Sequence, residues 1–264
     1  MTKSVLLDLT QCIGCGACTV ACKLWNQLEF ADGAPATGEK AVKDHSNWTT
    51  VTFRKVQKDG APVWRFVKEQ CLHCLEPACV SVCFAKALQI SKEGAVVYRP
   101  DLCVGCRYCM LGCPFSVPKY EWQRSLPNVS KCQMCAGKIA QGEVPACVGA
   151  CPTGAMTFGE RDDNLALARQ RIEQGNGRYI NHIYGEKEAG GTRWLYLSDV
   201  DFSKLGMVTN VPEVPIASFT DDYLRWTVPL LAGGALLFTA LRHYTKRRND
   251  IESSQASQKE SKKK

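Results

Sequence analysis

The sequence has no cysteine outside four short groups, although 16 of its 264 residues are cysteines. It has only four histidines, and no Cys-x-x-Cys pair is followed by the histidine that c-type haem attachment requires. We also find no Gly-rich nucleotide loop and no cluster of histidines with carboxylates. These absences exclude a c-type cytochrome and argue against a stand-alone enzyme.

The cysteines that are present fall into four groups of four. In chain order the groups are Cys12, Cys15, Cys18, Cys22; Cys71, Cys74, Cys79, Cys83; Cys103, Cys106, Cys109, Cys113; and Cys132, Cys135, Cys147, Cys151. The first and third groups have the C-x2-C-x2-C-x3-C spacing of [4Fe–4S] sites, and Pro114 completes that motif after the third. The spacing predicts four [4Fe–4S] clusters that carry electrons.

Two other uses of cysteine are less consistent with this spacing. Disulfides rarely need three cysteines at successive spacings of two. A structural zinc site has no use for a third cysteine two residues beyond a Cys-x-x-Cys knuckle. Zinc in one of the four sites is the main alternative that stays open.

A separate inference concerns which cysteines share a cluster. In two-cluster ferredoxins, the fourth cysteine of each run ligates the other cluster. Groups two and three are close neighbours and groups one and four flank them, which predicts nested sets. These are cluster 1, Cys12, Cys15, Cys18 and Cys151; cluster 2, Cys71, Cys74, Cys79 and Cys113; cluster 3, Cys103, Cys106, Cys109 and Cys83; and cluster 4, Cys132, Cys135, Cys147 and Cys22. The alternative pairs group one with two and group three with four, but the long insert before Cys71 disfavours it.

The expected fold class is α+β, with two nested two-cluster ferredoxin-like units, an inserted hairpin and one C-terminal transmembrane helix. We expect an outer unit of residues 1–22 and 120–160, an insert of residues 23–68, and an inner unit of residues 69–119. Within them we expect a strand over 4–9, a polar loop over 32–44, a connector over 119–130, and a hairpin of 50–58 and 62–68 turning at Asp59-Gly60.

Residues 161–220 contain no cysteine and are expected to form a partner-docking extension. A helix is expected to begin at Asp162 or Asp163 and to end at Gly175. One face of that helix carries Leu165, Ala168 and Ile172. Two strands are expected after it, over residues 178–183 and 192–197.

An uncharged segment, WTVPLLAGGALLFTAL at residues 226–241, follows the extension. It is short for a membrane span, which needs about 20 residues. Because the arginines at both ends can snorkel toward the membrane surface, we expect a span over residues 221–245. Pro229 is expected in the first turn of this helix, where proline is tolerated. The charged flanks disfavour the alternative, a buried core helix. By the positive-inside rule, the basic tail of residues 246–264 is cytoplasmic and the cluster domain is periplasmic, at the inner membrane. Residues 253–264 are expected to be disordered.

The first residues show no basic start and long apolar run of a secretory signal. Because iron–sulfur proteins are loaded in the cytoplasm, we expect the folded chain to be exported with a partner that carries a twin-arginine signal. The formal charge of +7 falls to about −1 when four clusters contribute about −2 each. The excess of basic residues is therefore explained without a nucleic-acid partner.

Several basic residues adjoin the cysteine groups, where positive charge would offset the clusters and help to set their potentials. They are Lys23, Lys68, Lys86, Arg107, Lys131 and Lys138. Each could equally be a solvated surface residue. His73 could tune a cluster and His243 could contact a partner's cofactor, but a loop residue and an interfacial polar residue are the simpler interpretations.

Longer stretches of the sequence carry a resemblance to a known family. They are CIGCGACTVACKLWN, NWTTVTFRK, CLHCLEPAC, CVGCRYCMLGCPFSVPKY, KCQMCAGKIAQGEVPACVGACPTGAMTFG, GGTRWLYL, and the span ending in RHY. With these stretches the chain resembles the β (iron–sulfur) subunits of membrane-bound respiratory formate dehydrogenases, the formate dehydrogenase-N type. The four-cluster core alone is shared by β subunits of polysulfide, dimethyl sulfoxide and nitrate reductases and of some membrane hydrogenases.

The resemblance implies a role within a complex of anaerobic respiration. A molybdenum or tungsten pterin α subunit would oxidise formate, this chain would pass electrons through four clusters without a catalytic site of its own, and a membrane γ subunit with haem b would reduce quinone. The family's ligation pattern is the nested one. The alternative is the equivalent subunit of a hydrogenase or sulfur-compound reductase, and a zinc-bound membrane adaptor is a more distant one. A higher-order oligomer of the heterotrimer is left open.

Overall fold

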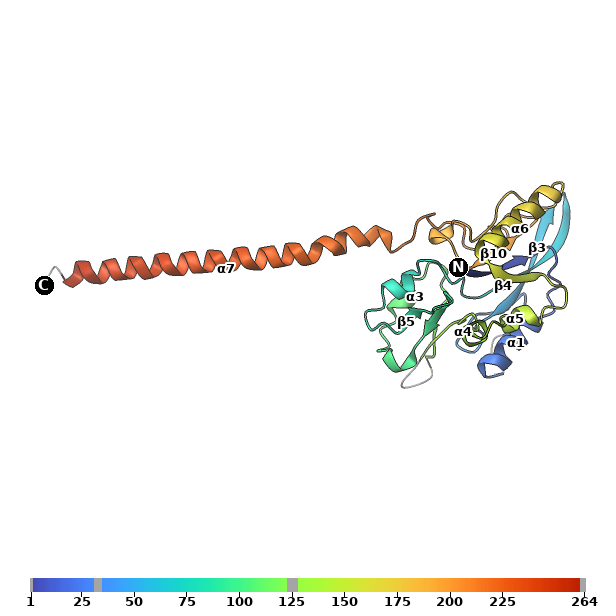
Figure 1. Cartoon of the computed structure of the whole chain (residues 1–264), viewed down its shortest axis with the longest axis horizontal. Coiled ribbons are helices and arrows are strands. Elements are labelled where there is room, and N and C mark those ends of the chain that lie inside the picture. Colours follow the sequence, from blue (N-terminus) through green and yellow to red (C-terminus); the bar gives the residue numbers. More distant parts are fainter. Residues whose placement is uncertain (1, 31–34, 123–127, 262–264) are drawn as a thin grey trace. The chain divides into compact units, whose positions relative to one another are not determined.

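The computed structural model describes residues 2–30, 35–122 and 128–261. It divides the chain into two compact units, Met1–Ala217 and Ser218–Lys264 (Figure 1). Parts of three expected segments lie outside the described residues. These parts are residues 32–34 of the polar loop, 123–127 of the connector, and 262–264 of the tail.

A three-stranded sheet brings the two ends of the cysteine-bearing region together. Strand β1 (Lys3–Asp8) lies between antiparallel β9 (Met156–Glu160) and parallel β10 (Trp194–Leu197). Residues Val5, Leu6 and Leu7 are all buried, because helix and loops cover both faces of the strand. Since β1 leads into the first cysteine group and β9 follows the fourth, the sheet holds groups one and four near each other.

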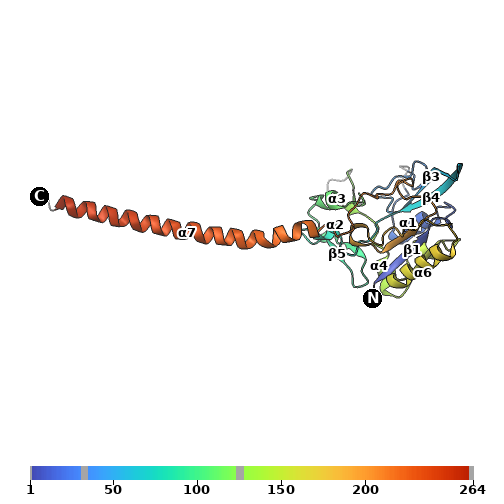
Figure 2. The same ribbon diagram turned by 90° about the horizontal axis from the view of Figure 1, so that it is seen from above.

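Helix α6 (Arg161–Gln174) packs against β1 and covers one face of the sheet (Figure 2). Its Leu165 and Ala168 are buried in a cluster with Leu6, and Ile172 is partly buried against them. The predicted helix and its apolar face are therefore confirmed, although the helix begins at Arg161 and Glu160 caps it without a side-chain hydrogen bond.

The predicted hairpin is also confirmed. Strand β3 (Thr50–Lys58) pairs with β4 (Ala61–Glu69), and short β2 (Thr37–Gly38) extends the sheet on the β3 side. Asp59 and Gly60 both have positive φ, 51° and 81°, which is the backbone of a type I′ turn.

Short elements surround the cysteine groups. They are α1 (Ala17–Asn26), α2 (Ala78–Ser81), η1 (Pro100–Leu102), α3 (Tyr108–Gly112), α4 (Ala136–Ala140) and α5 (Ala146–Gly149), with hairpins β5 (Leu88–Ile90)–β6 (Val96–Tyr98) and β7 (Lys119–Tyr120)–β8 (Val129–Ser130). Helix α1 packs against α5, and α2 packs against α3. Group one therefore faces group four, and group two faces group three, which is the arrangement that nesting requires.

The region after α6 differs partly from expectation. Residues 194–197 form β10, but residues 178–183 form no strand; instead Tyr184 makes an isolated bridge to Tyr196. The physical reason is a local turn: Ile180 N–H donates to Ser198 O at 3.0 Å, but His182 N–H donates back to Ile180 O at 2.8 Å and so interrupts the ladder. The short helix η2 (Glu188–Gly190) then leads into the sheet.

The second unit consists of helix α7 (Ser218–Ser261), which is longer than the predicted span. Two expectations about it are wrong: Pro229 lies in the helix interior rather than the first turn, and residues 253–261 are helical rather than disordered. Good helix formers such as Lys, Arg, Glu and Gln, and an Arg248–Glu252 pair at i,i+4, explain the extension.

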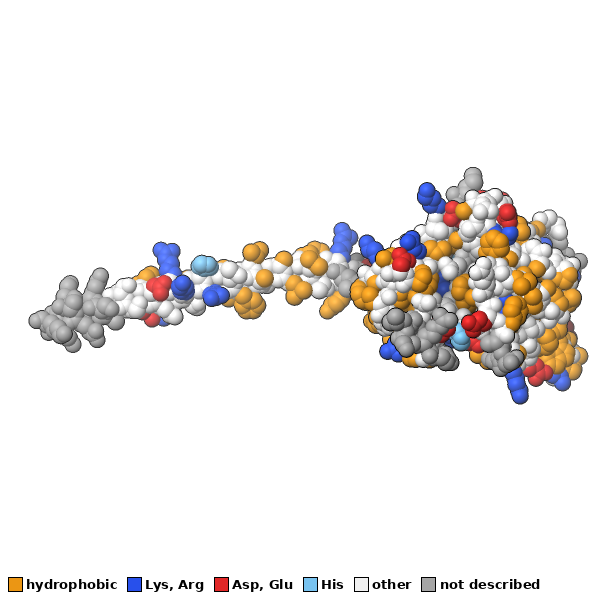
Figure 3. Space-filling model, turned by 90° about the horizontal axis from the view of Figure 1, so that it is seen from below, with side chains coloured by type: hydrophobic (Ala, Val, Ile, Leu, Met, Phe, Trp, Pro, Cys, Tyr) orange, Lys and Arg blue, Asp and Glu red, His pale blue; other side chains and the backbone are white. Residues whose placement is uncertain are grey.

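The apolar part of α7 is exposed on all sides within this unit. Leu230, Leu236 and Phe238 keep 70%, 73% and 72% of their surface. Figure 3 shows the hydrophobic side chains of α7 as a band between basic groups. By length and composition α7 could cross a membrane.

Candidate iron–sulfur centres

The backbone of all four cysteine groups bends in the same way at the same position. The residue just before the second cysteine has positive φ in each group: 70° at Gly14, 50° at His73, 69° at Gly105 and 53° at Met134. This left-handed bend turns a backbone N–H toward the preceding sulfur, because Gly105 N–H donates to Cys103 Sγ at 3.4 Å and Met134 N–H to Cys132 Sγ at 3.3 Å. The four loops are thus one structural repeat.

His73 occupies the left-handed position of the second group without a glycine's freedom. It is buried, and its Nδ1 accepts a hydrogen bond from Val96 N–H at 2.9 Å. Among the described residues, its Nε2 has no hydrogen-bond partner. Burial, and then Lys131 and Arg193, hold the pKa of His73 well below its usual range. A neutral, buried loop residue is therefore the simpler of the two sequence interpretations.

The thiols of groups one and four gather in the outer part of the fold. A small cavity is lined by Cys12, Cys15, Cys18 and Cys151. Cys22, the last cysteine of group one, instead lies near thiols of group four: Cys132, Cys135 and Cys147.

The thiols of groups two and three show the same exchange. A second small cavity is lined by Cys103, Cys106 and Cys109 together with Cys83, the last cysteine of group two. Cys113, the last cysteine of group three, lies near the three other cysteines of group two, namely Cys71, Cys74 and Cys79. Each quartet combines three thiols of one group with one of another.

These donor sets fit a [4Fe–4S] cluster. All sixteen cysteines are free of disulfide bonds. In the part of the chain that the structure describes, no three His, Cys, Asp or Glu side chains converge closely enough to hold one metal ion. A cubane of four irons holds its four thiolates farther apart than a single zinc ion does.

Burial dominates the electrostatics of the thiols. It raises the pKa of Cys18 and Cys79 to about 12 and that of Cys109 and Cys135 to about 11. Because metal ligands must be deprotonated thiolates, iron uptake by these residues releases protons that the apoprotein would retain at neutral pH.

Two lysines are buried among the thiols. Lys68 and Lys131 are only 1% and 2% exposed. Burial lowers the pKa of Lys68, but thiols including Cys147 and Cys18 outweigh it, so its pKa is raised. Lys131 Nζ donates to Val96 O and, at 3.0 Å, to Cys132 O. The sequence suggested charge beside the cysteine groups, but it did not show that these two lysines are buried.

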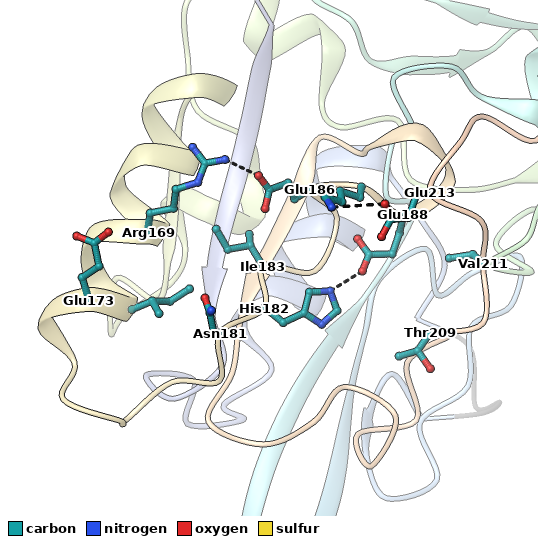
Figure 4. A pocket seen from close by; sticks show the side chains of 12 residues that line it. Arg169, Glu173, Asn181, His182, Ile183, Glu186, Glu188, Thr209, Val211 and Glu213 are labelled. Carbon is teal, nitrogen blue, oxygen red and sulfur yellow. Dashed lines mark hydrogen bonds and ion pairs between the residues drawn. The ribbon is translucent and has the colours of Figure 1, made fainter.

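A cavity of about 540 Å³ lies in the extension and contains no cysteine. Figure 4 shows several of its polar side chains paired with one another: His182 Nε2 lies 2.8 Å from Glu188 Oε1, and Arg169 bonds Glu186. None of the residues that line the cavity belongs to a cysteine group. The cavity is therefore separate from the electron-carrying site.

The cysteine quartets, free thiols and left-handed loops define a ferredoxin-like iron–sulfur protein. Residues 62–161 match a family described as 4Fe-4S dicluster domain, and residues 11–87 match a second family with the same description. Both ranges include the second cysteine group, so they leave the pairing undecided. Two dicluster domains with sixteen cysteines correspond to four [4Fe–4S] clusters.

Comparisons with curated proteins extend this likeness. A protein of Nitratidesulfovibrio vulgaris is 42% identical over 253 residues, covering 94% of this chain and 68% of the relative. The hydrogenase-2 operon protein HybA of Shigella flexneri is 34% identical over 241 residues, covering 77% and 72%. The formate dehydrogenase iron-sulfur subunit of Haemophilus influenzae is 33% identical over 248 residues, covering 90% and 78%.

The chain belongs to the family of 4Fe–4S dicluster ferredoxin-like subunits. It is an electron-transfer iron–sulfur subunit of an oxidoreductase complex. The predicted cofactors and the mixed α and β fold with a long apolar C-terminal helix are thereby confirmed.

Proposed function

We propose that this chain is the electron-transfer subunit of a membrane-bound formate dehydrogenase complex. The observation that carries the electron-transfer part of the proposal is the exchange of last cysteines between groups, which supports two interlocked pairs of clusters. The thiols of Cys132 in the outer pair and Cys71 in the inner pair interact, which supports transfer between the pairs. Likeness to formate dehydrogenase iron-sulfur subunits supports the formate part. When bound, the clusters supply one-electron carriers. The chain's own residues bury or partly bury all the cysteines except Cys15 and Cys106, and they aim backbone N–H groups at sulfur.

The proposed ligand sets are the nested ones. Cluster 1 uses Cys12, Cys15, Cys18 and Cys151; cluster 2 uses Cys71, Cys74, Cys79 and Cys113; cluster 3 uses Cys103, Cys106, Cys109 and Cys83; and cluster 4 uses Cys132, Cys135, Cys147 and Cys22. The cavities lined by the first and third of these sets support the assignment. The packing of α1 on α5 and of α2 on α3 supports it as well.

The proposed domains follow from these sets. Residues 1–22 and 120–160 form the outer unit, 69–119 the inner unit and 23–68 the insert. Residues 161–220 form the docking extension, 221–245 the anchor and 246–264 the tail. The sheet of β1, β9 and β10 supports the outer unit, because it joins its two chain segments.

The proposed partners are a molybdenum or tungsten pterin α subunit and a haem b γ subunit. Likeness to formate dehydrogenase iron-sulfur subunits supports them. The anchor would be in the inner membrane with the cluster domain periplasmic, because basic residues follow the apolar segment. A C-terminal tag should then be accessible to a membrane-impermeant reagent only from the cytoplasmic side.

A hydrogenase complex is the second candidate, because HybA of Shigella flexneri is similarly identical to this chain. Purification of the intact complex separates the two. The formate proposal predicts that molybdenum or tungsten co-purifies and that formate bleaches the cluster absorbance. Nickel in the complex, with bleaching by hydrogen and not by formate, would favour the hydrogenase and overturn the formate proposal.

A further inference from the structure

Lys68 comes from the inserted hairpin, but the thiols with the largest effect on it do not belong to the adjacent second cysteine group. It lies at the end of β4, three positions before Cys71. The thiols that act on it most strongly are those of Cys147, Cys18, Cys132 and Cys22. These cysteines come from groups one and four. The hairpin therefore delivers one lysine between two sets of thiols that are distant in sequence.

The side chain lines the site of proposed cluster 1, and its charge acts on thiols of proposed cluster 4, the other cluster of the outer pair. It lines the cavity formed by the four thiols of cluster 1. The charge of Lys68 also acts on Cys22, Cys132 and Cys135, which are three of the four proposed ligands of cluster 4. One ammonium group is thus shared between two clusters.

A hydrogen-bond network holds the ammonium group in place. Lys68 Nζ donates to Gln70 Oε1 at 2.7 Å, and Gln70 Nε2 donates to Tyr196 OH at 2.7 Å. Tyr196 OH in turn donates to the Lys68 carbonyl at 3.2 Å, which closes the ring. The ammonium also lies 4.2 Å from the centre of the Trp194 ring, a cation–π contact.

Water cannot screen this charge, because Lys68, Gln70 and Tyr196 are almost completely buried. In a poorly hydrated interior a charge acts over a longer distance than at the surface. One-electron reduction adds one negative charge to a cluster, and a nearby fixed cation stabilises that product.

We infer that Lys68 is a positioning residue that raises the reduction potentials of both clusters of the outer pair. The inference rests on the proposed ligand sets. The inner pair has a different arrangement: buried Lys131 acts on Cys79 and Cys113, two ligands proposed for cluster 2. Lys68 and Lys131 therefore differ in their main partners, although Lys131 Nζ also donates to the carbonyl of Cys132, a proposed ligand of cluster 4.

The test is a potentiometric EPR titration of the full complex with Lys68→Met. Methionine keeps the length and removes the charge. Two of the four midpoint potentials should fall, each corresponding to at least a tenfold weaker reduction equilibrium, which is 59 mV for one electron. Lys131→Met should lower the potential of cluster 2 and leave that of cluster 1 unchanged; cluster 4 is not compared in this variant, because Lys131 Nζ also donates to the carbonyl of its ligand Cys132. Tyr196→Phe, which keeps the ammonium, should shift the two potentials less than Lys68→Met does.

Other results would contradict the role inferred for Lys68. Four unchanged potentials in a fully loaded Lys68→Met complex would overturn the inference, and so would an equal fall in all four. If Lys68→Met loses iron, the potentials are measured in Lys68→Arg instead. A Lys68→Arg complex that holds all four clusters at their original potentials would support a role of the charge. Iron loss in Lys68→Arg as well would make Lys68 a packing residue and overturn it. A wild-type complex without four clusters would instead refute the proposed function.

Discussion

At the scale of single residues, the last cysteine of each group has the most informative position. Cys151 lines a cavity with Cys12, Cys15 and Cys18, although Cys147 is its nearest cysteine in sequence. A substitution at this position therefore separates the nested pairing from ligation by sequence neighbours.

We predict that Cys151→Ala disturbs cluster 1 and leaves cluster 4 intact. The physical reason is that cluster 1 loses one of four thiolates, while Cys132, Cys135, Cys147 and Cys22 remain. EPR of the reduced complex should show loss or conversion of one signal. Cys22→Ala is the matched control and should affect cluster 4 instead. If Cys151→Ala instead loses only the EPR signal of the cluster held by Cys132, Cys135 and Cys147, the nested pairing is refuted.

Gly14 shows why some loop residues must be small. Its φ is 70°, and an added Cβ would lie 2.5 Å from Phe66 Cδ1. We predict that Gly14→Ala destabilises the fold by about 1–3 kcal/mol and lowers the occupancy of cluster 1. Gly137→Ala, in helix α4 with open space around the new Cβ, should be neutral or slightly stabilising. Equal melting temperatures of the two variants would contradict this explanation.

At the scale of elements, two partly buried ion pairs that share one carboxylate fix the inserted hairpin to the rest of the first unit. Asp199, with a side chain 3% exposed, accepts from Lys58 Nζ at 2.7 Å and from Arg65 Nε at 2.7 Å. Lys58 is on β3 and Arg65 is on β4, so one carboxylate holds both strands. Burial raises the pKa of Asp199, but the bonds from Arg65 and Lys58 outweigh it and lower the pKa to about 2.

We predict that Asp199→Asn lowers the free energy of unfolding by about 2 kcal/mol at pH 7. A carboxylate with a lowered pKa stabilises the fold above its ordinary value of 3.8, and this contribution is lost as the pH falls toward about 2. The difference from wild type in urea midpoint should therefore shrink below about pH 4. Asp201→Asn, at an exposed carboxylate bonded to Ser203, is the control. A difference that persists unchanged at pH 3 would contradict the assignment.

The elements also show where prediction from sequence works and where it stops. Two segments rich in Val, Phe, Trp and Thr and an Asp-Gly turn were sufficient for the hairpin of β3 and β4, and cysteine spacing was sufficient for the cluster loops. The left-handed bends at His73 and Met134 had no such signal, because non-glycine residues adopt positive φ only rarely, histidine somewhat more often than most. The position of Lys68 among groups one and four also depends on tertiary packing. The helical segment 253–261 was missed because charge and polarity indicate disorder and a solvated helix equally well.

At the scale of the whole molecule, the chain combines an electron-carrying unit with a helix suited to a membrane. The apolar side chains of α7 lack cover within their unit, and exposing them to water would be unfavourable. A lipid bilayer is the solvent that fits them, since about 33 Å of helix over residues 223–244 matches the hydrocarbon core.

We predict that truncation after residue 222 releases the cluster-bearing unit, with its catalytic partner, from membranes. The reason is that the truncated chain lacks the whole apolar segment. Fractionation of membranes after an alkaline wash measures the distribution. Truncation after residue 250, which keeps the segment, is the control and should remain in the membrane fraction. Membrane retention of the shorter chain would show that α7 is not the anchor.

Metal and sulfide analysis of the anaerobically purified full-length chain tests the central claim most directly. Four clusters require about sixteen irons and sixteen acid-labile sulfides per chain. We predict values close to these, with little zinc. About twelve irons with one zinc would contradict the four-cluster assignment, and several zinc ions without sulfide would refute the electron-transfer function itself.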